Sequence, residues 1–103
     1  MIKVSVLYRS DEGRKFDTAY YLGNHMPMVK EKFGAVCKGA EVDLGLSGAE
    51  PGSKPAYFAM AHFLFDSVDA FQKAFGPHAG AIMADIPNYT DVAPLIQLSE
   101  VKM

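Results

Sequence analysis

The segment Phe16–Phe33 constrains the fold of this 103-residue chain most strongly, because it predicts a helix with one face packed on a sheet. Asp17 is a good N-cap, since its carboxylate can accept from the free backbone N–H groups of the first turn, at the positive end of the helix dipole. Phe16 and Tyr21 occupy the N′ and N4 positions of a hydrophobic staple. The helix is therefore predicted to begin at or near Asp17.

An apolar stripe and a proline define the rest of this helix. The stripe recurs at intervals of four, three and four residues and predicts the face that packs on the sheet, formed by Leu22, Met26, Val29 and Phe33. Gly34 then follows as a C′ stop. Pro27 lacks an N–H and its ring crowds the carbonyl of Gly23, so we expect a kink or break near Gly23–Asn24 and a restart with Pro27 in the first turn. His25 would lie at this break, beside free backbone groups and a space between helix and sheet.

Length and composition limit what can be built around this helix. The chain is predicted to form one domain over residues 1–103, because that length leaves no room for a second core. Hydrophobic residues make up 50% of so short a chain, which indicates that another subunit covers some apolar surface. The net charge of −2 includes no basic block, so a nucleic-acid partner is not expected.

The cysteines, histidines and apolar runs exclude several further classes of protein. Cys37 is the only cysteine, which rules out a disulfide within the chain and a cysteine-rich zinc site. The three histidines, at positions 25, 62 and 78, lack the spacing of a metal motif, and we expect no metal. The first apolar run is too short for a signal peptide, and no segment has membrane-spanning length. The expected location is the cytoplasm, with no membrane partner.

Three segments have the periodicity of strands. Residues 2–9 largely alternate between apolar and polar side chains, and residues 36–46 have two unlike faces, so each predicts a strand. Tyr57–Phe65 is almost continuously apolar, and we expect a strand buried on both faces.

The remaining residues predict a second helical region and a last strand. Asp66 or Ser67 caps a helix whose buried side is expected to carry Val68, Phe71 and Phe75. A short helix, a loop and a strand complete the chain over residues 79–85, 87–91 and 95–101.

The order βαββαβ predicts an α+β fold, in which an antiparallel four-stranded sheet of ferredoxin-like type carries both helices on one face. If the strand parities align, the second face of the sheet is mixed and its polar side chains are Lys3, Ser5, Glu41, Asp43, Gln97 and Ser99. Such an uncovered face suits either water or a second sheet.

Four motifs, taken in order, resemble the EthD family of small dimeric α+β barrel proteins. They span nearly the whole chain and read Tyr20-Tyr21-x-x-x-His25-x-Pro27, Gly39-x-Glu41-Val42, Phe65-Asp66-Ser67-x-x-Ala70-Phe71 and Asp85-Ile86-Pro87-Asn88-Tyr89. The resemblance implies a homodimer in which two sheets pair face to face into a barrel. It also implies a link to the degradation of ethers and other small organic molecules. Relatives of the same fold include cofactor-independent isomerases, cyclases and monooxygenases, and also haem-binding branches.

His25 and the two tyrosines before it are the main candidates for a site. An imidazole titrates near pH ~6.5, so His25 could act as a general acid or base; alternatively, it caps carbonyls freed by Pro27. Tyr21 shares a helical row with His25, and Tyr20 lies about a third of a turn away. Either tyrosine could donate to an oxyanion or line an aromatic pocket, and at least one is expected to be ordinary core.

Other residues are candidates for contacts with a ligand. His62 lies in the most apolar strand, which favours a hydrogen-bonded core histidine over a pocket residue. Asn88 and Tyr89 are turn residues first and candidates for a pocket mouth second. Met28 completes the predicted substrate-binding set, which comprises Tyr20, Met28, His62, Asn88 and Tyr89.

The leading hypothesis is an EthD-like protein of small-molecule catabolism. It would bind a small hydrophobic or aromatic compound in a Tyr- and His-lined pocket between helix and sheet, and catalyse an isomerisation or oxidation without a cofactor. In this hypothesis His25 moves the proton, while Tyr21, with Tyr20 or His62, orients the substrate. The alternative is a non-catalytic binding or accessory protein of a degradation pathway. A haem-binding domain is a third, weaker interpretation.

Overall fold

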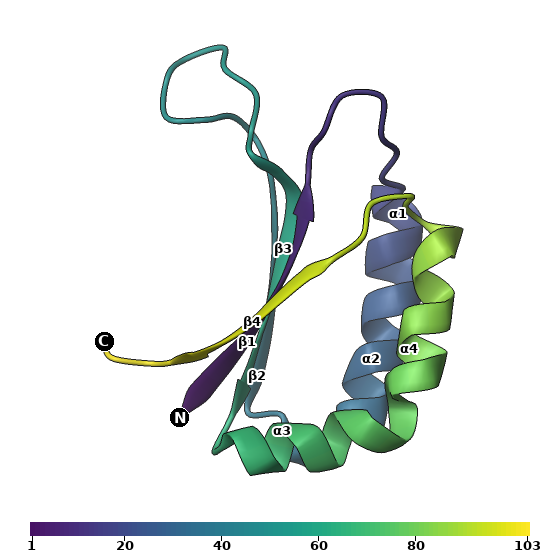
Figure 1. The fold of residues 1–103 in the computed structure, drawn as a ribbon, viewed down its shortest axis with the longest axis vertical. Helices are drawn as coiled ribbons and strands as arrows, with labels where there is room; N and C mark the ends of the chain where they lie inside the picture. The colour runs from purple at the N-terminus through teal and green to yellow at the C-terminus, as the bar shows by residue number, and fades with distance from the viewer.

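The computed structural model, which describes residues 1–103, contains one antiparallel sheet with the strand order β2-β3-β1-β4. The strands are β1 Ile2–Arg9, β2 Gly39–Leu44, β3 Tyr57–Phe65 and β4 Leu95–Glu100. Figure 1 shows the helices on one side of this sheet and both chain termini at the same end of it. The predicted α+β fold of ferredoxin-like βαββαβ order is confirmed.

The first helical segment begins and ends where the sequence predicts. It consists of α1 Thr18–Tyr20, a π-helical turn over Tyr21–His25 and α2 Met26–Phe33. Oδ1 of Asp17 accepts from the backbone N–H of Tyr20 at 3.1 Å, and the Phe16 and Tyr21 rings lie 5.0 Å apart as a staple requires. The helix ends at Gly34, whose φ of +66° is a conformation that glycine adopts without strain.

A full break near Gly23–Asn24 does not occur, because a π-helical turn keeps the chain helical, but the α-helix restarts with Pro27 in its first turn as predicted. The N–H of Met26 donates to the carbonyl of Tyr21, five residues back, and the wider turn accommodates a proline that has no N–H to donate. Each residue of a π turn is rotated about the helix axis by a smaller angle than in an α-helix. Side chains in this turn therefore face directions other than those that an α-helical stripe predicts. Leu22, predicted to face the sheet, is 43% exposed, whereas Tyr21 and His25 are buried.

One face of the sheet carries the core, and the other is open. Val4 pairs with Phe63 and Tyr8 with Ala59, and these side chains are buried beneath the helices. The prediction that Tyr57–Phe65 is buried on both faces is wrong for this chain, because its side chains at positions 60, 62 and 64 are only half-buried where no helix covers them. The strand predicted over residues 36–46 is shorter, since residues 34–36 form a 3-10 turn.

The second helical region consists of α3 Val68–Phe75 and α4 Ala79–Asp85, with α3 capped by the Ser67 hydroxyl. Phe71 is buried as predicted, but Val68 is 42% exposed because it occupies the first turn, which faces outward. The expected loop over 87–91 is also more ordered than predicted: it begins within a 3-10 turn over Ile86–Asn88 and returns Tyr89 to the core.

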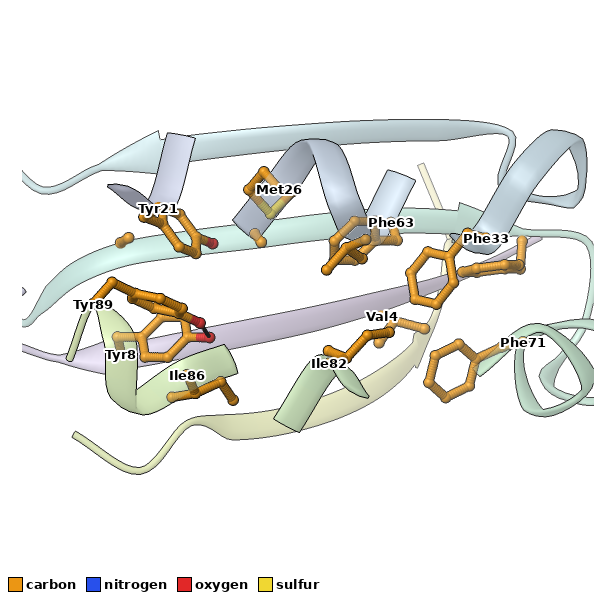
Figure 2. Close-up of a cluster of buried hydrophobic side chains, with 14 residues drawn as sticks. Val4, Tyr8, Tyr21, Met26, Phe33, Phe63, Phe71, Ile82, Ile86 and Tyr89 are labelled. Atoms are coloured by element: carbon orange, nitrogen blue, oxygen red, sulfur yellow. Dashed lines mark hydrogen bonds between the residues drawn. The ribbon is translucent and has the colours of Figure 1, made fainter. Parts of the chain in front are cut away.

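The core has two chemically different ends (Figure 2). At one end Phe33 packs edge to face with Phe63 and Phe65, and Phe65 does so with Phe71; at the other end Tyr8, Tyr21 and Tyr89 gather beneath the π turn. The polar atoms of the interior are therefore concentrated at the tyrosine end.

Candidate functional site

A cavity of about 50 Å³ lies between the sheet and the helices, with His25 and Tyr21 in its wall. Most of the wall is apolar, and Met83 and Ile96, which are half-exposed, border it on the β4 side. A pocket for a drug-sized ligand commonly exceeds ~300 Å³, so this cavity in its present shape suits only a very small molecule. Met26 and Met83 are flexible side chains that can repack around a larger one.

His25 pairs with Asp85, the last residue of α4. Nδ1 of His25 lies 3.0 Å from Oδ2 of Asp85. The second oxygen, Oδ1, accepts from the Tyr20 hydroxyl at 2.7 Å and from Nδ2 of Asn88 at 2.9 Å. Both oxygens of the carboxylate are thus engaged, and His25 is held in one orientation with its other nitrogen, Nε2, free of hydrogen bonds within the chain.

The pKa shifts of this pair favour a neutral imidazole beside a charged carboxylate. Burial lowers the pKa of His25, and the hydrogen bond and charge of Asp85 offset only part of that effect. Burial works to raise the pKa of Asp85, but the hydrogen bonds from Asn88, Tyr20 and His25 outweigh it and leave the pKa below its usual value. At neutral pH, Nδ1 therefore carries the ring proton and donates a hydrogen bond to Asp85, while Nε2 is a proton acceptor.

We expect His25 to titrate below the ordinary imidazole value of pH ~6.5. Because folding lowers this pKa, the stability that depends on neutral His25 is complete above that value and is lost as the pH falls through the pKa of the folded state. The measurement is a two-dimensional NMR titration of the ring protons, assigned with a His25→Gln variant. Asp85→Asn should lower the pKa further, because it removes the charge that favours the protonated ring. A His25 pKa above the ordinary value would contradict this description.

The three core tyrosines do not share one hydrogen-bond arrangement. The hydroxyls of Tyr8 and Tyr89 lie 2.6 Å apart and satisfy each other. The Tyr21 hydroxyl is buried without a partner, although its ring packs 5.8 Å from that of His25 and nearly parallel to it. Burial raises the pKa of Tyr21, so this phenol stays protonated and is available as a donor.

The structure places the sequence-predicted residues in three different settings. Tyr21 and His25 line the cavity, whereas Tyr20 and Asn88 bind Asp85 beside it. Tyr89 is buried in the core and does not line this cavity, and its hydroxyl binds that of Tyr8.

Met28 and His62 are not brought to the cavity. Met28 packs against the core from α2, but its neighbour Met26 forms the cavity wall. His62 lies on the open face of the sheet, where Nδ1 is 2.8 Å from the Ser5 hydroxyl and Nε2 is 3.7 Å from Asp43. The two histidines therefore occupy opposite faces of the sheet.

Sequence reasoning did not identify Asp85 or Tyr8 as site residues. Asp85 stands 60 positions from His25 in sequence, and two strands (β2 and β3) and two α-helices (α2 and α3) separate His25 from the helix that Asp85 ends. The sequence feature that could have identified Asp85 is its position at the start of the Asp85–Tyr89 motif, three residues before Asn88. No group of three or more His, Cys, Asp and Glu side chains converges in the structure, and none of the helices is both long and apolar enough to cross a bilayer.

The fold and the part-buried His25–Asp85 pair define a small ferredoxin-like α+β protein with a mainly apolar cavity. Residues 10–93 match the EthD domain, and the chain belongs to the EthD family. No protein of curated function matches the sequence.

Three solved structures illustrate the similarity. An EthD-like protein from Ralstonia eutropha JMP134 is 47% identical, with a TM-score of 0.94 over 99% of this chain and 92% of that one. An ethyl tert-butyl ether D (EthD) family protein from Bacillus halodurans C-125 is 18% identical, with a TM-score of 0.69 over 99% of both chains. A dimeric ferredoxin-like protein from Thermobifida fusca YX is 16% identical, with a TM-score of 0.61 over 97% of this chain and 90% of that one. The last two, at this identity, show the fold alone.

Proposed function

We propose that this protein binds a small, mainly apolar molecule in the cavity between sheet and helices, and that His25 transfers a proton to or from it. The observation that carries the proposal is that His25, in the wall of a mainly apolar cavity, lies 3.0 Å from the carboxylate of Asp85 behind it. Membership of the EthD family supports a role connected with small molecules. The name of the Bacillus halodurans relative refers to one such molecule, ethyl tert-butyl ether.

The chemistry follows from which ring nitrogen is free. Asp85 accepts a hydrogen bond from Nδ1–H and stabilises the imidazolium that forms when Nε2 takes a proton from the ligand. Tyr20 and Asn88 hold the carboxylate in place by occupying its second oxygen. Removing a proton at one carbon and returning it at another is an isomerisation that needs only this base. Oxidation would also need dioxygen as a co-reactant, so isomerisation is the reaction that we favour within small-molecule catabolism.

Binding at the cavity is tested by NMR with a library of small apolar fragments. We expect bound fragments to shift the methyl resonances of Met26 and Met83, which border the cavity, and the ring protons of His25. Met28 is the matched control, because its methyl group lies on the same helix but not in the cavity wall. Shifts at Met28 alone, or at none of these groups, would count against the proposed site.

A non-catalytic binding or accessory protein is the second candidate. The small size of the cavity and its largely apolar wall favour it, since a protein that only retains an apolar molecule needs no base. In that case His25 and Asp85 would serve as a structural hydrogen bond between the π turn and α4.

We also propose that the chain forms a homodimer through the open face of the sheet. This face combines polar side chains such as Lys3 and Asp43 with the apolar Leu7, Met60 and Leu64, and no helix covers it. The Thermobifida fusca protein of the same fold is described as dimeric. We expect a dimer burying more than ~1,000 Å². Sedimentation that finds only monomer at micromolar concentration would refute it.

A further inference from the structure

The Tyr21 hydroxyl is the one buried side-chain polar atom without a hydrogen-bond partner. The residue is 1% exposed, so water outside the protein does not satisfy it. Leaving a buried donor unpaired costs its desolvation free energy, and proteins rarely retain such a group without a use for it. The unpaired hydroxyl therefore lowers the free energy of unfolding of this protein.

The neighbouring groups explain why the hydroxyl is left over. Tyr8 and Tyr89 pack against the Tyr21 ring, with centroids at 5.7 and 5.1 Å, yet their hydroxyls bind each other. In Figure 2 the Tyr21 oxygen points inward between the helix layer and the sheet, apart from that bonded pair. Tyr21 and His25 both line the cavity: Tyr21 has a hydroxyl without a partner, and His25 has a ring nitrogen, Nε2, that makes no hydrogen bond within the chain.

We propose that the ligand of this cavity is a small, uncharged carbonyl compound whose oxygen accepts a hydrogen bond from Tyr21. This inference rests on the proposed function, which it narrows to one chemical class. Nε2 of His25 takes a proton from the carbon next to the carbonyl, and the C–H electron pair moves to form a carbon–carbon double bond. The carbonyl π electrons move to the oxygen, where the Tyr21 O–H stabilises the enolate. Return of the proton to a carbon restores a neutral carbonyl compound.

The wall of the cavity argues against other ligand classes. A carboxylate would be buried without a cation, because neither Lys nor Arg lines the cavity. A hydrocarbon would leave Tyr21 unpaired. An ether could accept from Tyr21, but it has no acidic C–H for His25 and no atom that takes up charge when a proton leaves. A carbonyl compound can accept a hydrogen bond from the Tyr21 hydroxyl and can give an α-proton to Nε2 of His25.

The test uses three small rings that differ mainly in one group: cyclopentanone, tetrahydrofuran and methylenecyclopentane. Binding is followed by the NMR shifts of Met26 and Met83 in the unmodified protein and in Tyr21→Phe. We expect cyclopentanone to bind about fivefold more tightly than methylenecyclopentane, as one net hydrogen bond implies. This preference should disappear in Tyr21→Phe. The protein should accelerate exchange of the cyclopentanone α-protons in D₂O, and His25→Ala should lose most of this acceleration.

A melting experiment separates this role from a structural one. Tyr21→Phe removes an unpaired hydroxyl and should leave the melting temperature unchanged or raise it. Tyr8→Phe is the matched control, because it removes a buried hydroxyl that has a partner at 2.6 Å and should lower the melting temperature. A lower melting temperature for Tyr21→Phe would show that its hydroxyl is satisfied within the fold and would overturn the inference.

The binding outcomes distinguish the inference from the proposed function. Equal binding of ketone and hydrocarbon, or a preference that survives in Tyr21→Phe, overturns the carbonyl assignment and leaves the cavity as an apolar binding site. Tetrahydrofuran binding as tightly as cyclopentanone, with no α-proton exchange, also overturns it, in favour of an ether. Failure of all three probes to shift either methionine overturns the inference and the proposed site together.

Discussion

Replacing His25 by alanine is expected to lower the rate of proton transfer to the cavity ligand by ~10²–10⁴-fold, the usual contribution of a general acid or base. The reason is that Nε2 of His25 makes no hydrogen bond within the chain and can accept a proton, whereas Asp85 does not line the cavity and both of its oxygens already accept hydrogen bonds. The fold should persist, at a cost of about 1 kcal/mol for the lost hydrogen bond to Asp85. The measurements are α-proton exchange and a thermal melt.

His78→Ala is the matched control, because this histidine lies in the turn Gly76–His78 and does not line the cavity. It should leave the exchange rate unchanged. An unchanged rate in His25→Ala, with a clear loss of stability, would instead support the non-catalytic alternative, in which the His25–Asp85 pair joins two helical segments.

Replacing Phe65 by alanine is expected to destabilise the fold by ~3–5 kcal/mol, the usual cost of removing a large aromatic side chain from a core. Phe65 is fully buried, and its ring packs at 5.3 Å from Phe33 and 5.4 Å from Phe71. Since domains of this kind are stable by only ~5–15 kcal/mol, the variant should be partly or wholly unfolded at 37 °C. Urea denaturation followed by circular dichroism measures the change.

Val68→Ala provides the comparison for Phe65→Ala. Val68 is 42% exposed in the first turn of α3, so its truncation should change the unfolding free energy by less than ~1 kcal/mol. A cost for Phe65→Ala no larger than that of Val68→Ala would mean that the phenylalanine end of the core is not the main source of stability.

The candidate site was only partly predictable, because its residues meet through different kinds of contact. Tyr21 and His25 are four positions apart on one helical segment, so a local rule places them together, and both line the cavity. Asp85 is brought to His25 only by the packing of α4 beside the first helical segment. A lone aspartate at the end of a short helix has no local pattern that distinguishes it from a surface carboxylate. His62 does not lie near His25, and the sequence could not show this. Strand periodicity assigns a residue to one face of the sheet but does not say which face the helices cover.

The sequence by itself determined the elements that depend on local energetics. The Asp17 cap, the Gly34 stop and the strand periodicity of β1 act within a few residues, and the structure confirms them; of the two caps expected for α3, Asp66 or Ser67, it has Ser67. Only the tertiary structure decided the π turn over Tyr21–His25, since packing must favour turning Tyr21 and His25 inward over exposing Leu22. It also decided which tyrosine hydroxyl has no partner, because that choice depends on where Tyr8 and Tyr89 meet across 81 residues of sequence. Local rules describe bonds between neighbours in the chain, whereas the cavity, its base and its donor arise from contacts that form only when the helices close over the sheet.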